Sequence, residues 1–150
     1  MTTVTDAVRE ARERGEPDRL LRVIPYARWL DLEGEMVDGA PRLRMPFSPR
    51  RIGDSAIPAL HGGTIGALLE SAAVFTAIWI NDAPALPKTV SMTVDYLRSG
   101  RAEETFASAQ VLRHGRRILV VEARAWQDDP QRPIARAKVC IRMRDPERSS

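Results

Sequence analysis

The longest apolar stretch in the chain runs from Gly62 to Ile80, and Glu70 is its only charged residue. Twelve of its 19 residues are apolar, which is typical of a fully buried helix or of a membrane span. An isolated charge near the middle of a span costs on the order of 2.5 kcal/mol or more, and no cluster of Lys or Arg flanks either end. The pattern therefore favours a central helix inside a soluble domain.

After this stretch, apolar and polar residues alternate with a period of two, as in half-buried β-strands. The breaks between the alternating segments contain Gly or Pro and are short enough for antiparallel hairpins. The sequence thus predicts an α+β fold, in which one long helix lies against the apolar face of a mostly antiparallel sheet. The alternating segments are 90–96, 105–113, 119–126 and 135–143.

The first part of the chain has the pattern of short helices. Apolar residues at i, i+3, i+4 and i+7 predict an amphipathic helix over 2–14, with Thr3 or Thr5 as its N-cap. A second helix is expected over 18–23, and Pro25 is expected to end it. These helices form an N-terminal extension of the domain.

A hairpin and a loop are predicted between this extension and the central helix. Strand-like segments at 32–37 and 41–47 flank the turn-forming pair Asp38-Gly39. Residues 48–58 contain Pro, Gly, Arg and Asp without a period, which indicates a loop leading to His61.

Length, composition and charge fit one globular domain. With 150 residues, 43% of them apolar and 29% charged, the chain is long enough to bury a core. We expect an extension over 1–23, a single domain over 24–145 and a tail over 146–150. Cys140 is the only cysteine, so no internal disulfide can form, and no hydrophobic signal segment opens the chain; the cytosol is the expected compartment.

The net charge of +3 is distributed unevenly along the chain. Residues 98–150 carry 12 basic and 7 acidic groups, which leaves this part at +5. Such an excess can bind phosphates, although a basic face is more often only solvated. Both interpretations remain open at this point.

His61-Gly62-Gly63 lies where the loop meets the predicted helix. Glycines there let a ligand approach the backbone N–H groups that a first helical turn leaves unpaired, which suits an anion or a developing oxyanion. Alternatively, the glycines only allow the helix to pack closely on the sheet. The pattern does not separate these two interpretations.

Glu70 is the second candidate for chemistry. A lone carboxylate in an apolar environment is a typical general base or nucleophile, and the alternative is a partner Arg from elsewhere in the fold. Gly62 and Glu70 are eight residues apart, or about 12 Å on a straight helix, which is beyond the reach of one glutamate side chain. We therefore hypothesise that two chains pack about a two-fold axis with these helices antiparallel, so that each site combines both.

The chain resembles a known family through three features in order. They are His61-Gly62-Gly63, the acid eight residues after the first glycine, and the strand Val-Ser-Met-Thr-Val-Asp-Tyr-Leu at 90–97. The pattern is similar to that of hotdog-fold acyl-CoA thioesterases of the phenylacetate-degradation (PaaI) type and covers about 24–143. The resemblance implies a curved antiparallel sheet wrapped around one long helix, and dimers that can pair into tetramers.

The resemblance also implies an activity and roles for individual residues. It implies hydrolysis of an acyl-CoA thioester to a carboxylic acid and CoA, with no metal or redox cofactor. From the sequence pattern we also expect neither nucleic acid nor membrane as a partner. Gly62 N–H would polarise the thioester carbonyl, Glu70 of the partner subunit would activate water or attack directly, and Thr89 would orient the water or the carboxylate. His61 resembles the histidine of the motif and is expected to be structural.

One position departs from the family pattern. Many relatives have an Asn six residues before the motif histidine, and here Ser55 stands there, beside Asp54. Pro58 also replaces a glycine that is common before the motif. The residues expected to contact substrate are His61, Gly63, Asp54 and Ser55, with Arg98, Arg116 and Arg117 for the CoA phosphates or, alternatively, as solvated side chains.

Two other functions fit the same pattern. A hotdog dehydratase acting on acyl thioesters would need a catalytic histidine paired with an acid, and His61 is the only candidate near Glu70. A non-catalytic acyl-CoA-binding or sensor protein would be favoured if the change at Ser55 disables the site.

Overall fold

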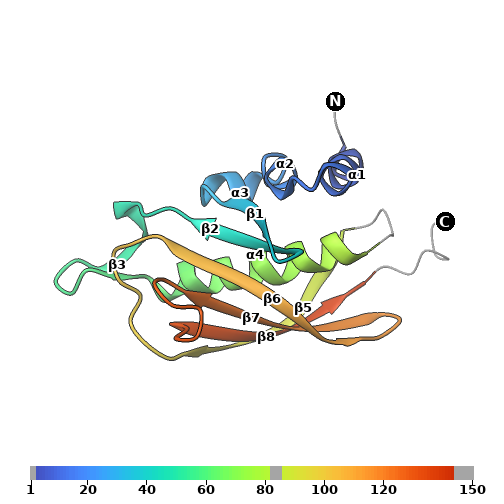
Figure 1. Ribbon diagram of the computed structural model, residues 1–150. Coiled ribbons are helices and arrows are strands. Elements are labelled where there is room, and N and C mark those ends of the chain that lie inside the picture. The colour runs from blue at the N-terminus through green and yellow to red at the C-terminus, as the bar shows by residue number, and fades with distance from the viewer. Residues whose placement is uncertain (1–2, 82–85, 144–150) are drawn as a thin grey trace.

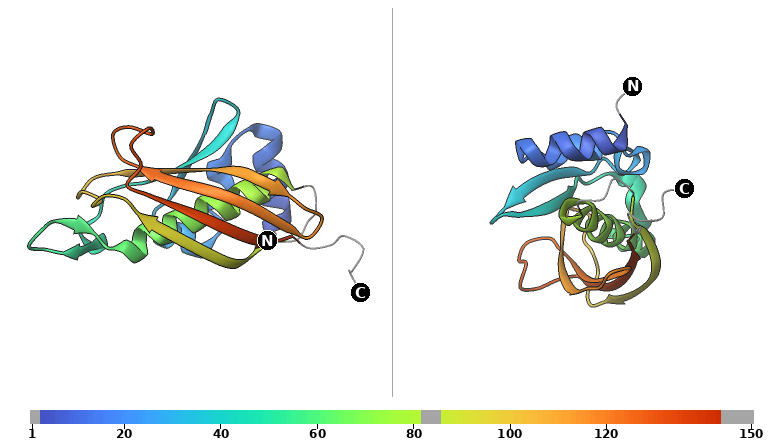
Figure 2. Two further views of the ribbon diagram at one scale, coloured as in Figure 1. Left: turned by 90° about the horizontal axis from the view of Figure 1, so that it is seen from below. Right: turned by 90° about the vertical axis from the view of Figure 1, so that its right-hand side faces the viewer.

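The computed structural model describes residues 3–81 and 86–143. At its centre lies α4 (Gly62–Ile80), around which a six-stranded sheet curves (Figures 1 and 2). Leu68, Leu69 and Ala73 of α4 are fully buried. Among the described residues α4 is the one helix long and apolar enough to span a membrane, but its packing inside the sheet makes it a core helix. The predicted central helix is confirmed.

The sheet has the strand order β1-β2-β6-β7-β8-β5, and all neighbouring strands are antiparallel. Alternate residues of β7 and β8, such as Val121 and Val139, are fully buried, which confirms the period-two prediction. The order leaves β5 at one edge and β1 at the other. The strands are β1 (Glu33–Val37), β2 (Ala40–Met45), β5 (Lys88–Tyr96), β6 (Thr105–His114), β7 (Ile118–Trp126) and β8 (Ala135–Arg142).

The predicted hairpin at Asp38-Gly39 joins β1 to β2. Both residues have positive φ, 50° and 79°, which is the conformation of a two-residue turn whose twist matches that of the strands. Asp tolerates this region because its short polar side chain can bond locally, and Gly has no Cβ to clash.

Three short helices cover the side of α4 that faces away from the sheet (Figures 1 and 2). They are α1 (Val4–Arg14), α2 (Pro17–Leu21) and α3 (Pro25–Trp29). The sequence did not predict α3, because Pro25 was expected to end a helix. Instead Pro25 begins one, at the first position, where its missing N–H costs no hydrogen bond.

Side chains cap α1 and attach it to α4. Thr3 is the N-cap, and its hydroxyl accepts the Asp6 N–H at 3.1 Å. Hydrogen bonds from the Thr3 hydroxyl and backbone N–H hold the pKa of the Asp6 carboxyl below its usual value. Arg12 Nε donates to the Trp79 carbonyl at 2.6 Å, where the last turn of α4 leaves carbonyls unpaired.

The segment expected to be a loop contains short regular elements. Pro49–Arg51 forms a 3₁₀ turn (η1), and β3 (Ile52–Asp54) pairs with β4 (Ala59–Leu60). The loop prediction was wrong here because the pairing is short and its register is irregular, so no period is visible. The tail predicted over 146–150 lies outside the described residues.

Candidate active site

The N-terminus of α4 presents a backbone N–H that is not bonded to any of the described residues. His61 is the N-cap, and its Nδ1 accepts the Gly63 N–H at 2.9 Å. The His61 N–H donates to the Arg51 carbonyl at 2.8 Å. In the described part of the chain, no acceptor is bonded to the Gly62 N–H. A free N–H at the positive end of a helix is suited to hold an oxyanion.

Two residues that the sequence analysis did not select hold this terminus in place. The Tyr96 hydroxyl, at the end of β5, donates to the Gly62 carbonyl at 2.8 Å. A Cβ on Gly53 of β3 would lie 2.9 Å from the His61 Cα, so the close approach of β3 requires glycine there. Neither contact has a signal in the sequence, because each joins segments that are distant in the chain or that lack a period.

Glu70 lies in the middle of α4, half-buried, on the wall of an apolar cavity of about 210 Å³. The cavity lies between α4 and the helices α2 and α3. Within residues 3–81 and 86–143, no cationic side chain pairs with Glu70, so the alternative of an Arg partner finds no support. The other lining residues are Leu21, Ile24, Tyr26, Ala27, Ser71, Val74, Phe75 and Ile78.

Gly62 and Glu70 belong to one continuous helix, as the spacing argument assumed. They are therefore about 12 Å apart along the axis. A single chain does not bring the free N–H and the carboxylate to one substrate atom.

Thr89 lies near the start of β5 with its side-chain oxygen buried. Among the described residues this Oγ1 has no hydrogen-bond partner, which is uncommon for a buried hydroxyl. The pairing of β5 with β8 shifts register between Thr89 and Ser91, and Val90 is 61% exposed. No hydrogen bond joins Thr89 to Glu70 within the described chain. Bulges are over-represented next to active sites, and a buried hydroxyl without a partner requires an explanation.

Asp54 is the last residue of β3, and Ser55 begins the turn that leads to β4; both are exposed. The Asp54 Oδ1 accepts the Ala56 N–H at 2.9 Å, so this carboxylate stabilises its own turn. In the described residues, no hydrogen bond joins either side chain to the Gly62 or Glu70 region.

The three candidate arginines are not at one place in a single chain. Arg98 follows β5, whereas Arg116 and Arg117 lie in the turn between β6 and β7. Antiparallel pairing puts these at opposite ends of the sheet, because the end of β5 pairs with the start of β8 and the start of β7 pairs with its end. Arg98 lines a pocket of about 240 Å³, and the other two line one of about 580 Å³.

Comparison with known proteins places the chain in a family. Residues 51–142 match the family model of the acyl-CoA thioesterase N-terminal domain. The medium/long-chain acyl-CoA thioesterase YigI of Salmonella typhimurium is 28% identical over 120 residues, which are 71% of this chain and 77% of YigI.

Two solved structures share the fold. One is a phenylacetic acid degradation-related protein from Ralstonia eutropha, with a TM-score of 0.74, 21% identity, and coverage of 85% of this chain and 98% of that one. The other is the BH2602 protein from Bacillus halodurans with CoA, with a TM-score of 0.73, 20% identity, and coverage of 95% and 89%.

The curved sheet around α4 and these structural neighbours define the hotdog class of fold. The chain belongs to the acyl-CoA thioesterase family and is a thioester hydrolase. The resemblance that the His61-Gly62-Gly63 motif indicated is thereby confirmed.

The capping bond of His61 can be tested by two substitutions. His61→Ala is expected to lower the free energy of unfolding by about 0.5–2 kcal/mol, because the Gly63 N–H loses its side-chain acceptor. His61→Asn restores an acceptor oxygen and is expected to recover most of the stability and of the hydrolysis rate. Urea denaturation and free-thiol release measure the two effects. An Asn variant that is stable but inactive would show that the imidazole itself takes part in the reaction.

Proposed function

We propose that the chain hydrolyses acyl-CoA thioesters at sites that are shared between two copies. The observation that carries this proposal is Glu70, a half-buried carboxylate without a cationic partner among the described residues, on the wall of an apolar cavity. Such a carboxylate can act as a base beside a bound acyl group. The Gly62 N–H of the other copy is the proposed carbonyl contact.

The proposed reaction has two steps. The Glu70 carboxylate accepts a proton as the water oxygen bonds to the carbonyl carbon, and the Gly62 N–H of the other copy stabilises the oxyanion. The tetrahedral intermediate then breaks its C–S bond, and the proton passes to the leaving sulfur. In the alternative, the carboxylate attacks directly and water cleaves the resulting anhydride. Thr89 is proposed to orient the water or the carboxylate, and neither route needs a metal or redox cofactor.

The edge strand β5 supports a shared site. It ends the strand order, and its Val90 and Tyr96 side chains are 61% and 54% exposed. An unpaired edge of this length is a template for pairing with another chain. If two β5 strands pair antiparallel about a two-fold axis, the α4 helices also run antiparallel, and the Gly62 end of one can approach the middle of the other. Further pairing into tetramers remains a prediction, as does a cytoplasmic location.

The cavity beside Glu70 is the proposed site of the acyl group. Its volume of about 210 Å³ is somewhat larger than an apolar cavity of roughly 150 Å³ that holds a benzene molecule. A medium-length alkyl chain or a phenyl group fits this space, which agrees in part with the name of the relative YigI.

The chemical role of Glu70 is tested by Glu70→Gln, which keeps the shape and removes the base. We expect kcat to fall by about 10²–10⁴-fold with little change in KM. Free-thiol release over a panel of acyl-CoA esters measures this, and Glu122→Gln, on the outer part of β7, is the matched control. Equal kcat values for Glu70→Gln and the native protein would exclude a role of Glu70 as the general base. Binding of acyl-CoA without turnover by the native protein would instead indicate a sensor.

The Gly62 N–H can be removed without disturbing the helix. Proline is favoured at the first helical position, and His61 already has the extended conformation that precedes proline. We expect Gly62→Pro to lower kcat by about 10²–10³-fold, whereas Gly62→Ala keeps the N–H and has a Cβ at the same 3.4 Å from the Tyr96 ring. Similar losses in both variants would point to steric hindrance and contradict the role of the N–H.

Mixing two inactive variants tests whether the site is shared. A dimer of one Gly62→Pro chain and one Glu70→Gln chain has one intact composite site, so random mixing should restore about a quarter of the native activity. If each site lay within a single chain, no mixture would regain activity. Activity is measured after the chains are unfolded and refolded together, with each variant refolded alone as the control.

The assignment of the acyl cavity is tested by filling it. Val74→Trp is expected to lower kcat/KM for octanoyl-CoA by roughly tenfold or more, and to affect acetyl-CoA much less, because the added ring occupies the space of the distal carbons. Leu112→Trp, at an exposed position of β6, is the control. An unchanged ratio of the two kcat/KM values would place the acyl group elsewhere.

A further inference from the structure

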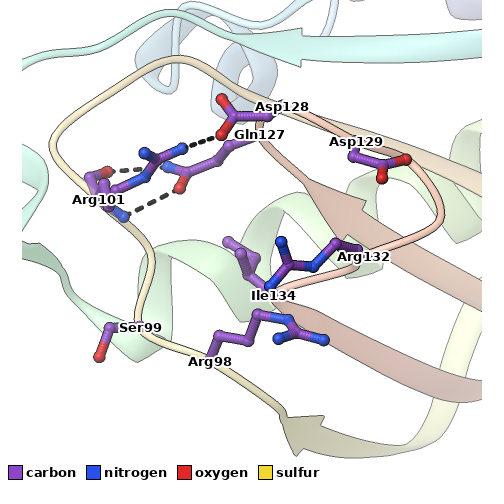
Figure 3. Close-up of a pocket in the computed structure, with 8 residues that line it drawn as sticks. All are labelled: Arg98, Ser99, Arg101, Gln127, Asp128, Asp129, Arg132 and Ile134. Atoms are coloured by element: carbon purple, nitrogen blue, oxygen red, sulfur yellow. Dashed lines mark hydrogen bonds and ion pairs between the residues drawn. The ribbon is translucent and has the colours of Figure 1, made fainter.

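A second pocket lies between the loop that follows β5 and the loop that joins β7 to β8 (Figure 3). Its volume is about 240 Å³. Figure 3 shows that three arginines and two aspartates reach it from these two loops. The lining residues are Arg98, Ser99, Arg101, Gln127, Asp128, Asp129, Arg132 and Ile134.

Two of the three arginines in this pocket are not paired with an acid from the described part of the chain. Among residues 3–81 and 86–143, neither Arg98 nor Arg132 forms an ion pair, and the one side-chain hydrogen bond of Arg98 runs from Nε to the Pro133 carbonyl at 3.4 Å. In Figure 3 the guanidinium groups of Arg98 and Arg132 extend into the same part of the pocket. Two cations in one pocket repel each other unless an anion lies between them.

The two aspartates of the pocket are engaged with other groups. Asp128 forms an ion pair with Arg101, which also pairs with Glu103 at 3.4 Å. The Asp129 Oδ1 accepts the Gln131 N–H at 2.8 Å and stabilises its own turn. In Figure 3 the Asp129 carboxylate points away from Arg98 and Arg132. The two arginines therefore provide uncompensated positive charge.

Buried hydrogen bonds fix the two loops relative to each other. Gln127, only 9% exposed, accepts the Arg101 N–H at 3.0 Å and donates to the Arg101 carbonyl at 2.9 Å (Figure 3). The N–H groups of Leu97 and Arg98 both donate to the Ile134 carbonyl, at 2.8 and 3.1 Å. The backbone positions from which Arg98 and Arg132 extend are thus fixed before any ligand binds, which lowers part of the cost of binding.

The pocket lies at the same end of the fold as the free Gly62 N–H. Gly100, in the loop that follows β5, packs so closely that a Cβ there would lie 3.1 Å from Ile65 of the first turns of α4 and 3.2 Å from Ile134 of the pocket. The Gly100 carbonyl also accepts the Leu60 N–H at 2.9 Å. One compact unit therefore joins the pocket to the start of α4.

We propose that Arg98 and Arg132 form a phosphate clamp, which binds a phosphate of the nucleotide portion of CoA. The inference rests on the proposed function and extends it to the part of the substrate far from the reacting carbon. Guanidinium groups present planar pairs of N–H donors that match phosphate oxygens, and they remain charged at every relevant pH. Arg132 was not among the candidates from the sequence, because the residues next to it in the sequence do not distinguish it from an ordinary solvated arginine.

The clamp is tested by comparing two substrates with the double variant Arg98→Ala/Arg132→Ala. With octanoyl-CoA we expect KM to rise by about tenfold or more, with kcat unchanged, because charge-assisted hydrogen bonds to phosphate are lost. With octanoyl-pantetheine, which lacks the nucleotide and its phosphates, kcat/KM is expected to equal that of the native protein. Arg113→Ala, at the opposite end of the sheet, is the control for a general change in charge.

A third substrate identifies the phosphate, and a binding measurement separates the clamp from the catalytic proposal. If the effect disappears with 3′-dephospho-octanoyl-CoA, the clamp binds the 3′-phosphate; if it persists, the clamp binds the diphosphate. An unchanged KM for octanoyl-CoA, or an equal loss with octanoyl-pantetheine, would overturn the clamp. Calorimetry with free CoA tests it without turnover: weaker binding by the double variant supports the clamp even if the native protein releases no thiol, and equal binding refutes it.

Discussion

The fold depends on covering one helix that is apolar on nearly every side. α4 cannot be exposed to water on any large face, since its residues Leu68, Leu69, Ala73 and Ala77 are all fully buried. The curved sheet covers one side, and α1 to α3 cover the other (Figure 2). The sheet curves continuously around α4, whereas the three short helices cover the other side of α4 in separate segments. The apolar cavity lies where α2 and α3 meet α4 incompletely, and Glu70 is on its wall.

This arrangement is also the reason for proposing a site that is shared between two chains. A long straight helix fixes its N-terminal N–H and its middle carboxylate rigidly, but at a separation that no side-chain rotation can close. The same sheet that buries α4 ends in β5, whose outer edge has no neighbour among the described residues. In the proposed two-fold assembly, pairing of the two β5 edges would also set the relative direction of the two α4 helices.

Much of the fold was predictable from the sequence because it depends on periodic patterns. The 19-residue apolar run predicted α4, and the alternation of apolar and polar residues predicted β5, β7 and β8. Both patterns are visible because burial requires apolar residues at regular positions. The elements that were missed have no period. The sequence alone does not distinguish Pro25, which begins α3, from a proline that ends a helix. The pair β3–β4 is too short to show an alternating pattern.

The candidate site was predictable only in the part that lies within one segment. His61, Gly62 and Glu70 share a single helix and its cap, so their spacing could be read directly. Tyr96 contacts Gly62, which is 34 residues away in the sequence. Arg98 and Arg132 are also far apart in the sequence but line one pocket. Both arrangements depend on how the strands pair. A residue whose role depends on strand order has no local signal.

Strand order also decides what the basic excess of the second half can do. In an antiparallel sheet, successive turns lie at alternate ends, so arginines that are close in sequence are separated in space. Arg98 and Arg116 are separated by a single strand, β6, and therefore lie at opposite ends. Arg132 lies in the loop between β7 and β8, two connections after the loop that holds Arg98. It is therefore at the same end of the sheet as Arg98, beside the start of α4. The basic excess is thus divided between the two ends of the sheet, and within one chain the part that includes Arg98 and Arg132 lies next to the free Gly62 N–H.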